Sequence, residues 1–271
     1  MLWTLESKAK LNNGFEIPYL GLGVYQSPPG ENTARAVRYA FKVGYRHIDT
    51  AELYGNETDV GRALRESRIR REDVFITTKV WNSHQGYDST LYACERSLGR
   101  LGLSYIDLYL IHWPVQGHDD DTWRAMIKLL HQGKAHAIGV SNYSIRELNE
   151  LLHKSDVVPA VNQVEFHPFL YQKELLSFCK NNNIQLEAYS PLTRGKKLSH
   201  PTVVEIAKKY SKTPAQVLLR WSLQHDVIVI PKSIHEHRIL ENSQVFDFQI
   251  ESKDMKFLDS MNEDFRTVFL D

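Results

Sequence analysis

Cysteine is scarce in this sequence: Cys94 and Cys179 are the only two among 271 residues, and both fall in segments with helical patterning. Two distant cysteines give neither a disulfide framework nor the paired spacing of a zinc site, which favours a reducing cytoplasm. The sequence also has no apolar run of about 18 residues, the length that spans a membrane, and no signal-peptide core near its first residue. We therefore expect a cytoplasmic protein without a membrane segment.

An excess of charge of either sign is missing as well, because 33 Lys and Arg residues balance 33 Asp and Glu residues. Binding to nucleic acid is disfavoured, since it needs a basic surface. Hydrophobic residues make up 42% of the chain and aromatic residues 11%, which excludes a disordered chain and allows a large core. No linker or composition break divides the sequence, so we expect a single domain over residues 1–271.

Apolar runs of strand length alternate with segments of helical periodicity along the chain. The predicted strands are Tyr19–Gly23, Arg46–Asp49, Val74–Lys79, Ile106–His112, Ala137–Ser141, Ala160–Val164, Gln185–Tyr189 and Val227–Ile230. The predicted helices are Asn32–Val43, Glu57–Glu66, Ser89–Leu101, Thr122–Gln132, Ile145–His153, Lys173–Asn181, Pro201–Tyr210, Pro214–Leu223 and Glu236–Phe246. This order indicates an α/β fold, a (β/α)8 TIM barrel, with residues 8–18 as an N-terminal β-hairpin that closes its bottom.

An open, doubly wound sheet is the alternative fold for such an alternation of strands and helices. That fold usually carries a glycine-rich dinucleotide fingerprint after an early strand. Gly21 and Gly23 are not followed by the third glycine of the fingerprint. The barrel is therefore the favoured prediction.

Seven of the predicted strands end in polar or ionisable residues. These endings are Asp49, Lys79, His112, Ser141 with Asn142, Gln163 with Glu165, Tyr189 with Ser190, and Lys232 with Ser233. Each has a structural explanation when taken alone: Asp49 could cap a helix, Lys79 could lie on the surface, and His112 could be a bonded core histidine. In a barrel, however, all these ends meet at the rim where barrel enzymes perform chemistry. Their number favours a convergent site.

Tyr54 follows Asp49 by five residues and supplies a phenol, which is a weak acid with an ordinary pKa of about 10. A nearby Lys79 ammonium would lower the pKa of this phenol, and Asp49 would keep the ammonium charged. His112 adds a hydrogen-bond donor that can orient a carbonyl oxygen. These four side chains predict a proton donor for the alkoxide that forms when a hydride reaches a carbonyl.

The same rim has groups suited to a hydride donor. Tyr189 offers an aromatic face, and the start of the last predicted helix favours an anion. Ser141, Asn142 and Gln163 have hydroxyl and amide groups that could bind a carboxamide. Lys232, Ser233 and Arg238 have cations and a hydroxyl that could bind a phosphate. The residues thus indicate a nicotinamide dinucleotide, although Lys232 and Arg238 alone would also fit a solvated helix face.

Seven motifs in order resemble those of the aldo-keto reductase family over nearly the whole chain. They are GYRHIDTAELYGNE, TTKVW, IHWP, GVSNY, VNQVEFHP, EAYSPL and VIPKSIHEHRILEN. The resemblance implies a (β/α)8 barrel and NAD(P)H-dependent reduction of aldehydes, 2-oxo-aldehydes and ketones. It assigns the role of general acid to Tyr54, tuned by Lys79 and Asp49, and the orientation of the substrate to His112.

The resemblance also implies where the cofactor would bind. Tyr189 would stack on the nicotinamide, and Ser190 and Leu192 would line the pyrophosphate. The other implied cofactor residues are Gly23, Val24, Asp49, Ser141, Asn142, Gln163, Ile230, Lys232, Ser233, Arg238, Glu241 and Asn242. The pair Lys232 and Arg238 would hold the adenosine 2′-phosphate, so NADPH is expected to bind better than NADH.

The implied substrate walls contain Tyr25, Tyr54, Trp81, His112 and Trp113, with Tyr25 standing where many family members carry Trp. The loops that set substrate choice are expected to be short, including a compact acidic loop over residues 114–121. The chain is most similar to the short microbial type, which includes glyoxal/methylglyoxal reductases and 2,5-diketogluconate reductases. This type implies an open site for small carbonyl compounds, and many members are monomers.

Two other functions are compatible with a barrel. The first is a non-catalytic, NADPH-binding or redox-sensing protein, which the presence of all four catalytic residue types disfavours. The second is a metal-dependent hydrolase or isomerase that would use His112, His167 and Asp49. No pair of histidines at successive strand ends supports it, so no metal is expected.

Overall fold

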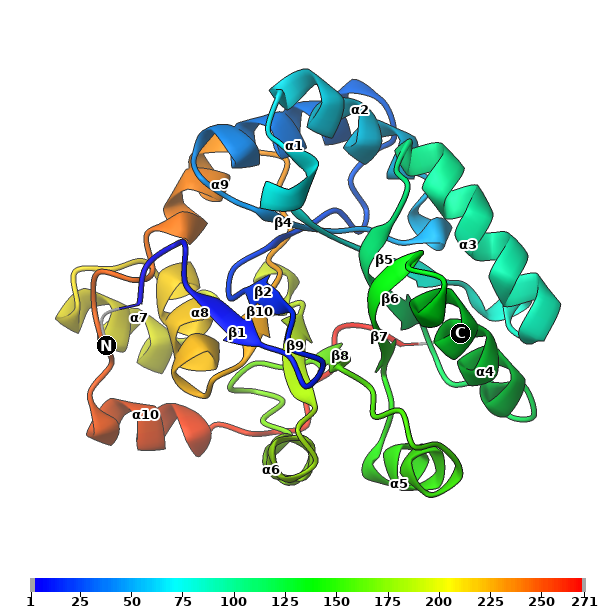
Figure 1. Ribbon diagram of the computed structural model, residues 1–271. Coiled ribbons are helices and arrows are strands. Elements are labelled where there is room, and N and C mark those ends of the chain that lie inside the picture. The colour runs from blue at the N-terminus through cyan, green and yellow to red at the C-terminus, as the bar shows by residue number, and fades with distance from the viewer. Residues whose placement is uncertain (1–2, 270–271) are drawn as a thin grey trace.

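A closed ring of parallel strands forms the centre of the computed structural model, which describes residues 3–269 (Figure 1). The strands follow one another in chain order: β3 (Leu22–Gly23), β4 (His47–Asp49), β5 (Phe75–Val80), β6 (Ile106–Ile111), β7 (Ala135–Ser141), β8 (Val161–Glu165), β9 (Gln185–Tyr189) and β10 (Ile228–Val229). The first and last strands also meet, because the Gly21 amide donates to the Val229 carbonyl at 2.9 Å and Gly23 bridges to Lys232. The predicted (β/α)8 barrel is confirmed.

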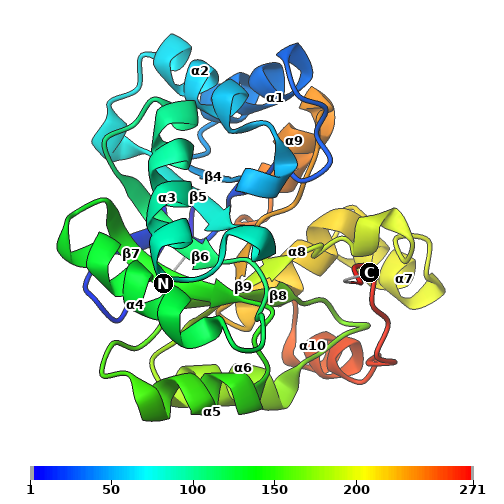
Figure 2. The same ribbon diagram turned by 90° about the vertical axis from the view of Figure 1, so that its right-hand side faces the viewer.

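Helices surround the strands on all sides, with α1 and α2 opposite α5 and α6 (Figure 2). They are α1 (Glu31–Lys42), α2 (Glu57–Ser67), α3 (Tyr87–Leu101), α4 (Asp119–His131), α5 (Ile145–Lys154), α6 (Lys173–Asn181), α7 (Pro201–Lys209), α8 (Pro214–Gln224), α9 (Glu236–Ser243) and α10 (Ser252–Asp259). Every predicted helix is present within a few residues of its expected bounds. The sequence reading missed α10, and none of these helices is both long and apolar enough to cross a bilayer.

The starts of two helices show how local sequence sets the boundaries. Ser144 and Thr213 each accept a hydrogen bond from the backbone three residues later, and the Glu or Gln at that position bonds back to complete a capping box. Pro201 and Pro214 occupy first-turn positions, where a missing amide proton costs nothing. These signals place α5, α7 and α8 where the sequence predicted them.

The acidic residues between β6 and α4 were predicted to form a loop, and this is wrong. Asp119, Asp120 and Asp121 form the first turn of α4 instead. Carboxylates stabilise a helix at this end because the first amides carry partial positive charge. Asp119 also accepts bonds from the Val115 amide at 3.1 Å and the Tyr143 hydroxyl at 2.8 Å, so the turn is tied to the rim.

The hairpin of β1 (Lys8–Lys10) and β2 (Glu16–Pro18) closes the bottom of the barrel, as predicted, and lies across its middle in Figure 1. Its buried side chains pack against residues that point into the barrel from β5 to β10. This lower interior cluster is made of Ala9, Leu11, Ile17, Phe75, Leu108, Leu110, Ala137, Ala160, Val161 and Ile228. The lower half of the barrel is therefore an apolar core.

The upper half of the barrel interior is polar. His47, Asp49, Lys79, Gln163 and Glu187 are each at most 2% exposed, and they come from two pairs of neighbouring strands, β4 with β5 and β8 with β9. Burying so many polar groups is costly unless each finds a partner. Their arrangement is therefore the starting point for the chemistry at the rim.

Candidate active site

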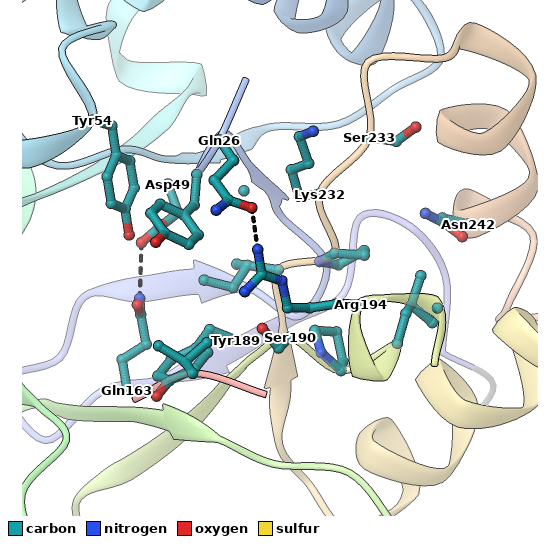
Figure 3. A pocket seen from close by; sticks show the side chains of 18 of the residues that line it. Gln26, Asp49, Tyr54, Gln163, Tyr189, Ser190, Arg194, Lys232, Ser233 and Asn242 are labelled. Carbon is teal, nitrogen blue, oxygen red and sulfur yellow. Dashed lines mark hydrogen bonds between the residues drawn. The ribbon is translucent and has the colours of Figure 1, made fainter. Parts of the chain in front are cut away.

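A cavity of about 760 Å³ opens at the carboxyl ends of the strands (Figure 3). The predicted residues that line it are Gly23, Tyr25, Asp49, Tyr54, Trp81, His112, Trp113, Ser141, Asn142, Gln163, Tyr189, Ser190, Leu192, Ile230, Lys232, Ser233, Arg238, Glu241 and Asn242. Two predicted residues do not line it: Val24 is fully buried, and Lys79 lies behind Asp49 and Tyr54. The chain thus brings nearly all of the expected site together.

Lys79 is held at the end of β5 by three oxygen atoms. Its Nζ atom donates to both carboxylate oxygens of Asp49, at 2.7 and 2.8 Å, and to the Thr50 carbonyl at 3.0 Å. The hydroxyl of Tyr54, on the short 3-10 helix Glu52–Tyr54, lies 3.4 Å from the same Nζ atom. The phenol, the ammonium and the carboxylate therefore form one connected group.

The expected direction of the Tyr54 pKa shift is wrong for this structure. Burial, and then the negative charge of Asp49, raise the pKa of the Tyr54 phenol well above its usual value. Burial is the larger cause because a phenolate is poorly solvated inside the protein, and the Lys79 ammonium is already paired with both oxygens of Asp49. Tyr54 is thus a neutral donor, whose proton leaves only when a strong base such as an alkoxide forms beside it.

His112 follows β6 and faces both Tyr54 and Trp81 edge to face, with ring centroids 5.6 and 5.1 Å away. Burial, and then the charge of Lys79, lower the pKa of His112 well below its usual value, so the imidazole is neutral. Its Nδ1 atom is enclosed, and no residue that the structure describes forms a hydrogen bond with it. The Nε2 atom remains available to donate to a ligand in the cavity.

Gln163 lies between two buried carboxylates, as part of Figure 3 shows. Its Nε2 atom donates to Asp49 Oδ2 and to Glu187 Oε2, both at 2.8 Å. A carboxylate accepts hydrogen bonds, so these two contacts fix the orientation of the amide. The Oε1 atom is left to accept a bond from a ligand, such as the NH₂ group of a carboxamide.

Glu187 is a buried residue of this network that was not among the predicted site residues. Burial, and then the charge of Asp49, raise the pKa of Glu187 to about 8. Its second oxygen has no hydrogen-bond partner and lies 3.6 Å from His47 Nε2. Its place after an apolar residue in the middle of β9 was the available signal, because alternate strand residues point into a barrel.

Asn142 connects β7 to the neighbouring strand ends. Its Nδ2 atom donates to the His112 carbonyl at 2.9 Å, and its Oδ1 atom accepts from the Tyr189 hydroxyl at 2.8 Å. Asn142 and Ser190 both have positive backbone φ angles, 65° and 47°, which residues other than glycine rarely adopt. Such backbone strain persists only where surrounding hydrogen bonds hold the residue in place. Here the bond from the Tyr189 hydroxyl to Asn142 orients the Tyr189 ring along the cavity wall.

The far end of the cavity is rich in cations. Among residues 3–269, Lys232 and Arg238 have no carboxylate within ion-pairing distance, and both side chains are exposed. Desolvation by the wall, and then the charge of Arg194, lower the pKa of Lys232. Unpaired cations that repel one another favour a bound anion, and they stand close to the start of α9. A phosphate-bearing dinucleotide therefore fits between this end and the Tyr189 ring.

Arg194 was not among the predicted cofactor residues, although it reaches across the cavity. It lies on a short 3-10 helix, Thr193–Gly195, and has left-handed backbone angles. Its guanidinium donates to the Gln26 side chain from the loop before α1, the contact drawn in Figure 3. Its other terminal nitrogen donates to the Thr267 carbonyl at 3.3 Å. Arg194 thus joins three separate segments of the rim.

Metal binding finds no support in the part of the chain that the structure describes. It contains no group of three or more His, Cys, Asp or Glu side chains placed to hold an ion. Cys94 and Cys179 are free and buried.

Together with the barrel, this rim is that of an oxidoreductase that reduces carbonyl groups with a dinucleotide. The chain belongs to the aldo/keto reductase family, whose sequence model matches residues 20–263. It is 52% identical over 263 residues to the glyoxal reductase of Bacillus subtilis (strain 168), with 97% of this chain and 95% of the relative covered.

Solved structures agree with this assignment. An aldo/keto reductase from Brucella melitensis has a TM-score of 0.91 at 48% identity, with 94% of this chain and 99% of that chain covered. An aldo-keto reductase solved in complex with NADPH has a TM-score of 0.92 at 37% identity, with 97% of this chain and 90% of that chain covered. The protein therefore reduces carbonyl compounds with a nicotinamide cofactor, and a non-catalytic barrel is not supported.

Proposed function

We propose that this protein reduces compact aldehydes and 2-oxo-aldehydes such as methylglyoxal to alcohols, with Tyr54 as the general acid. One observation carries the proposal: the Tyr54 hydroxyl lines the cavity and lies 3.4 Å from the ammonium of fully buried Lys79. The bound cofactor supplies the hydride that reaches the carbonyl carbon. Tyr54 gives its proton to the carbonyl oxygen, so an alcohol forms and the phenol becomes a phenolate.

The residues behind Tyr54 make that proton transfer favourable. Lys79 stabilises the phenolate as it forms, and Asp49 keeps Lys79 charged although it is buried. His112 donates from Nε2 to the carbonyl oxygen and holds it beside the phenol. A donor set that is fixed before the substrate arrives needs no rearrangement during the reaction, which lowers the barrier.

The cofactor is held along the cavity, from the acid to the unpaired cations. Tyr189 stacks on the nicotinamide, and Gln163 Oε1 accepts from its carboxamide with support from Ser141 and Asn142. The wall from the pyrophosphate to the adenosine is made of Gly23, Ser190, Leu192, Ile230, Lys232, Ser233, Arg238, Glu241 and Asn242. The cation pair prefers NADPH to NADH because only NADPH carries the 2′-phosphate.

The substrate end of the cavity favours small, partly apolar carbonyl compounds. Tyr25, Leu53, Trp81 and Trp113 line it beside Tyr54. Aromatic walls bind apolar groups, while the phenol and the imidazole select the carbonyl oxygen. The similar protein from B. subtilis is a glyoxal reductase, which agrees with a compact 2-oxo-aldehyde.

Steady-state assays test this function directly. Purified protein is mixed with NADPH or NADH, and the loss of cofactor absorbance is followed with methylglyoxal, 4-nitrobenzaldehyde and a bulky ketone. We expect efficient turnover of methylglyoxal, with a lower KM for NADPH than for NADH. Efficient turnover of the bulky ketone alone, or no turnover of any carbonyl, would contradict the proposal.

We also propose that the protein is a monomer, that it consists of one domain and that it is located in the cytoplasm. Both cysteines are free and buried, as suits a reducing compartment. One connected apolar core packs strands against helices from Leu20 to Leu258. Light scattering after size exclusion should give a mass near 31.4 kDa, and a dimer mass would overturn the monomer.

A further inference from the structure

The segment Thr267 to Phe269 forms part of the wall of the active-site cavity. Val268 and Phe269 both line the cavity that contains Tyr54 and His112. The Phe269 side chain is 71% exposed, so its neighbours cover little of it. Its position therefore depends on how the backbone just before it is held.

Glu165, the last residue of β8, holds that backbone. Its carboxylate accepts the Thr267 amide at 2.9 and 3.0 Å, and the Val268 amide at 3.2 Å. The Thr267 hydroxyl donates to the same carboxylate at 2.5 Å. The Nε2 atom of His167, two residues after Glu165, adds a contact at 3.1 Å. Three donors of one short segment thus converge on a single carboxylate.

The contact between Glu165 and the segment Thr267 to Phe269 is buried, so breaking it would cost free energy. The Glu165 side chain is 0% exposed, and Thr267 is 5% exposed. Burial raises the pKa of Glu165, but the bonds from His167 and Thr267 lower it overall, so the carboxylate is ionised. A buried charge left without donors is strongly unfavourable. The segment therefore has one stable position, with its amides on Glu165.

Other contacts fix the neighbouring backbone without reaching the cavity wall. The Glu263 and Phe265 amides donate to the Phe169 carbonyl at 3.2 and 3.0 Å. Asn262 accepts from the Tyr171 amide at 3.0 Å. These bonds hold the approach to the rim, whereas the Glu165 contacts, together with the bond from Arg194 to the Thr267 carbonyl, hold the residues directly before Phe269.

We infer that Glu165 is a positioning residue that sets substrate selectivity, because it holds Thr267 and Val268 so that Val268 and Phe269 narrow the cavity to compact carbonyl compounds. The inference deepens the proposed function and rests on it. Glu165 itself is absent from the cavity wall and touches no reacting group. Weakening its contact with the segment enlarges the cavity, which favours bulky substrates at the expense of small ones.

Three variants test the inference with methylglyoxal and 2-naphthaldehyde as small and bulky substrates. Thr267→Val removes one hydroxyl bond at nearly constant volume, Glu165→Gln removes the charge, and Thr267→Ser restores the hydroxyl. We expect Glu165→Gln and Thr267→Val to raise the ratio of kcat/KM for the bulky over the small aldehyde about tenfold, mainly through KM. Thr267→Ser should keep the ratio of the unmodified protein.

Asn262→Ala is the matched control, since it removes a bond of the same segment away from Val268 and should leave the ratio unchanged. An equal fall in kcat/KM for both aldehydes in Thr267→Val would reduce Glu165 to a structural role and overturn the inference. Amide hydrogen exchange of residues 264–269 gives a readout that needs no turnover. Exchange should be faster in Glu165→Gln, and unchanged protection would also overturn the inference. If the unmodified protein reduced neither aldehyde, the proposed function would fail while the exchange experiment still tested the anchor.

Discussion

The two ends of the active-site cavity are built in opposite ways. At the acid end, Lys79 and Asp49 are buried and bonded to each other, with Tyr54 against them. At the phosphate end, Lys232 and Arg238 are exposed and lack a carboxylate partner among the residues that the structure describes. The first group is complete within the protein, while the second needs an anion to balance its charge.

This difference separates catalysis from cofactor affinity. Groups that are fixed inside the barrel stabilise the transition state without rearrangement. An unpaired cation on the surface destabilises the protein little because water solvates it. When a phosphate binds, charge-assisted hydrogen bonds to the cation stabilise the complex. A substitution at the acid end should therefore change kcat and stability, and one at the phosphate end should change cofactor binding.

Tyr54→Phe should have the largest effect on activity. If it weakened cofactor binding instead of kcat, the distinction between the two ends of the cavity would be wrong. The phenyl ring keeps the packing but has no proton to give, so kcat should fall about 10²- to 10⁴-fold. The dissociation constant of NADPH, measured by fluorescence titration, should stay unchanged. Normal turnover in this variant would remove Tyr54 from the acid role.

Lys79→Met should destabilise the protein as well as slow it. The change leaves the buried Asp49 carboxylate without its cation, which costs about 3–5 kcal/mol. Urea unfolding would measure the loss, and kcat should fall in parallel. The double variant Lys79→Met with Asp49→Asn should recover part of the stability but none of the activity. Equal stabilities of the single and double variants would contradict the account of the pair.

Lys232→Ala tests the phosphate end of the cavity, where a substitution should change cofactor binding and leave kcat unchanged. Loss of a charge-assisted bond to the 2′-phosphate should weaken NADPH binding about 10- to 100-fold. NADH binding, kcat and the unfolding midpoint should stay unchanged, because Lys232 forms no ion pair with any residue between 3 and 269. Lys256→Ala, on the exposed face of α10, is the control for a general effect of charge. Equal weakening of both cofactors would place the phosphate elsewhere.

Glu187→Gln should have the smallest effect, on the pH dependence of stability. Since the pKa of Glu187 is raised to about 8, the folded protein keeps a proton that the unfolded chain loses above its ordinary carboxyl pKa. Stability should therefore be full below this ordinary pKa and fall as the pH rises towards 8. The neutral variant should show a flatter melting temperature over this range. An equally steep dependence would show that Glu187 is ionised in the folded state.

Residue type and position were enough to predict the barrel and most of the site. Asp49, Lys79 and His112 each end an apolar strand, and parallel strand ends meet at one rim. The capping signals at Ser144 and Thr213 predicted helix starts for the same local reason. Such features depend on neighbouring residues in the chain and are visible without a structure.

Features that depend on distant contacts could not be predicted in the same way. The contact of Arg194 with Gln26 joins residues 168 positions apart, and that of Thr267 with Glu165 joins residues 102 positions apart. The direction of the Tyr54 pKa shift depends on how deeply the fold buries the phenol and on how near it brings the Asp49 carboxylate. Asp119 was assigned to a loop, and its bond from the Tyr143 hydroxyl, 24 positions away, is not a local pattern.

The enclosure of Lys79 has a consequence for chemical labelling. Acylating reagents attack amines that solvent can reach, and the Lys79 ammonium is 0% exposed and held by three oxygen atoms. Mild acylation should therefore modify Lys232 and spare Lys79. A labelled preparation would bind the nucleotide phosphate less well while Lys79 stayed unmodified, so inactivation by such reagents would not be due to acylation of Lys79.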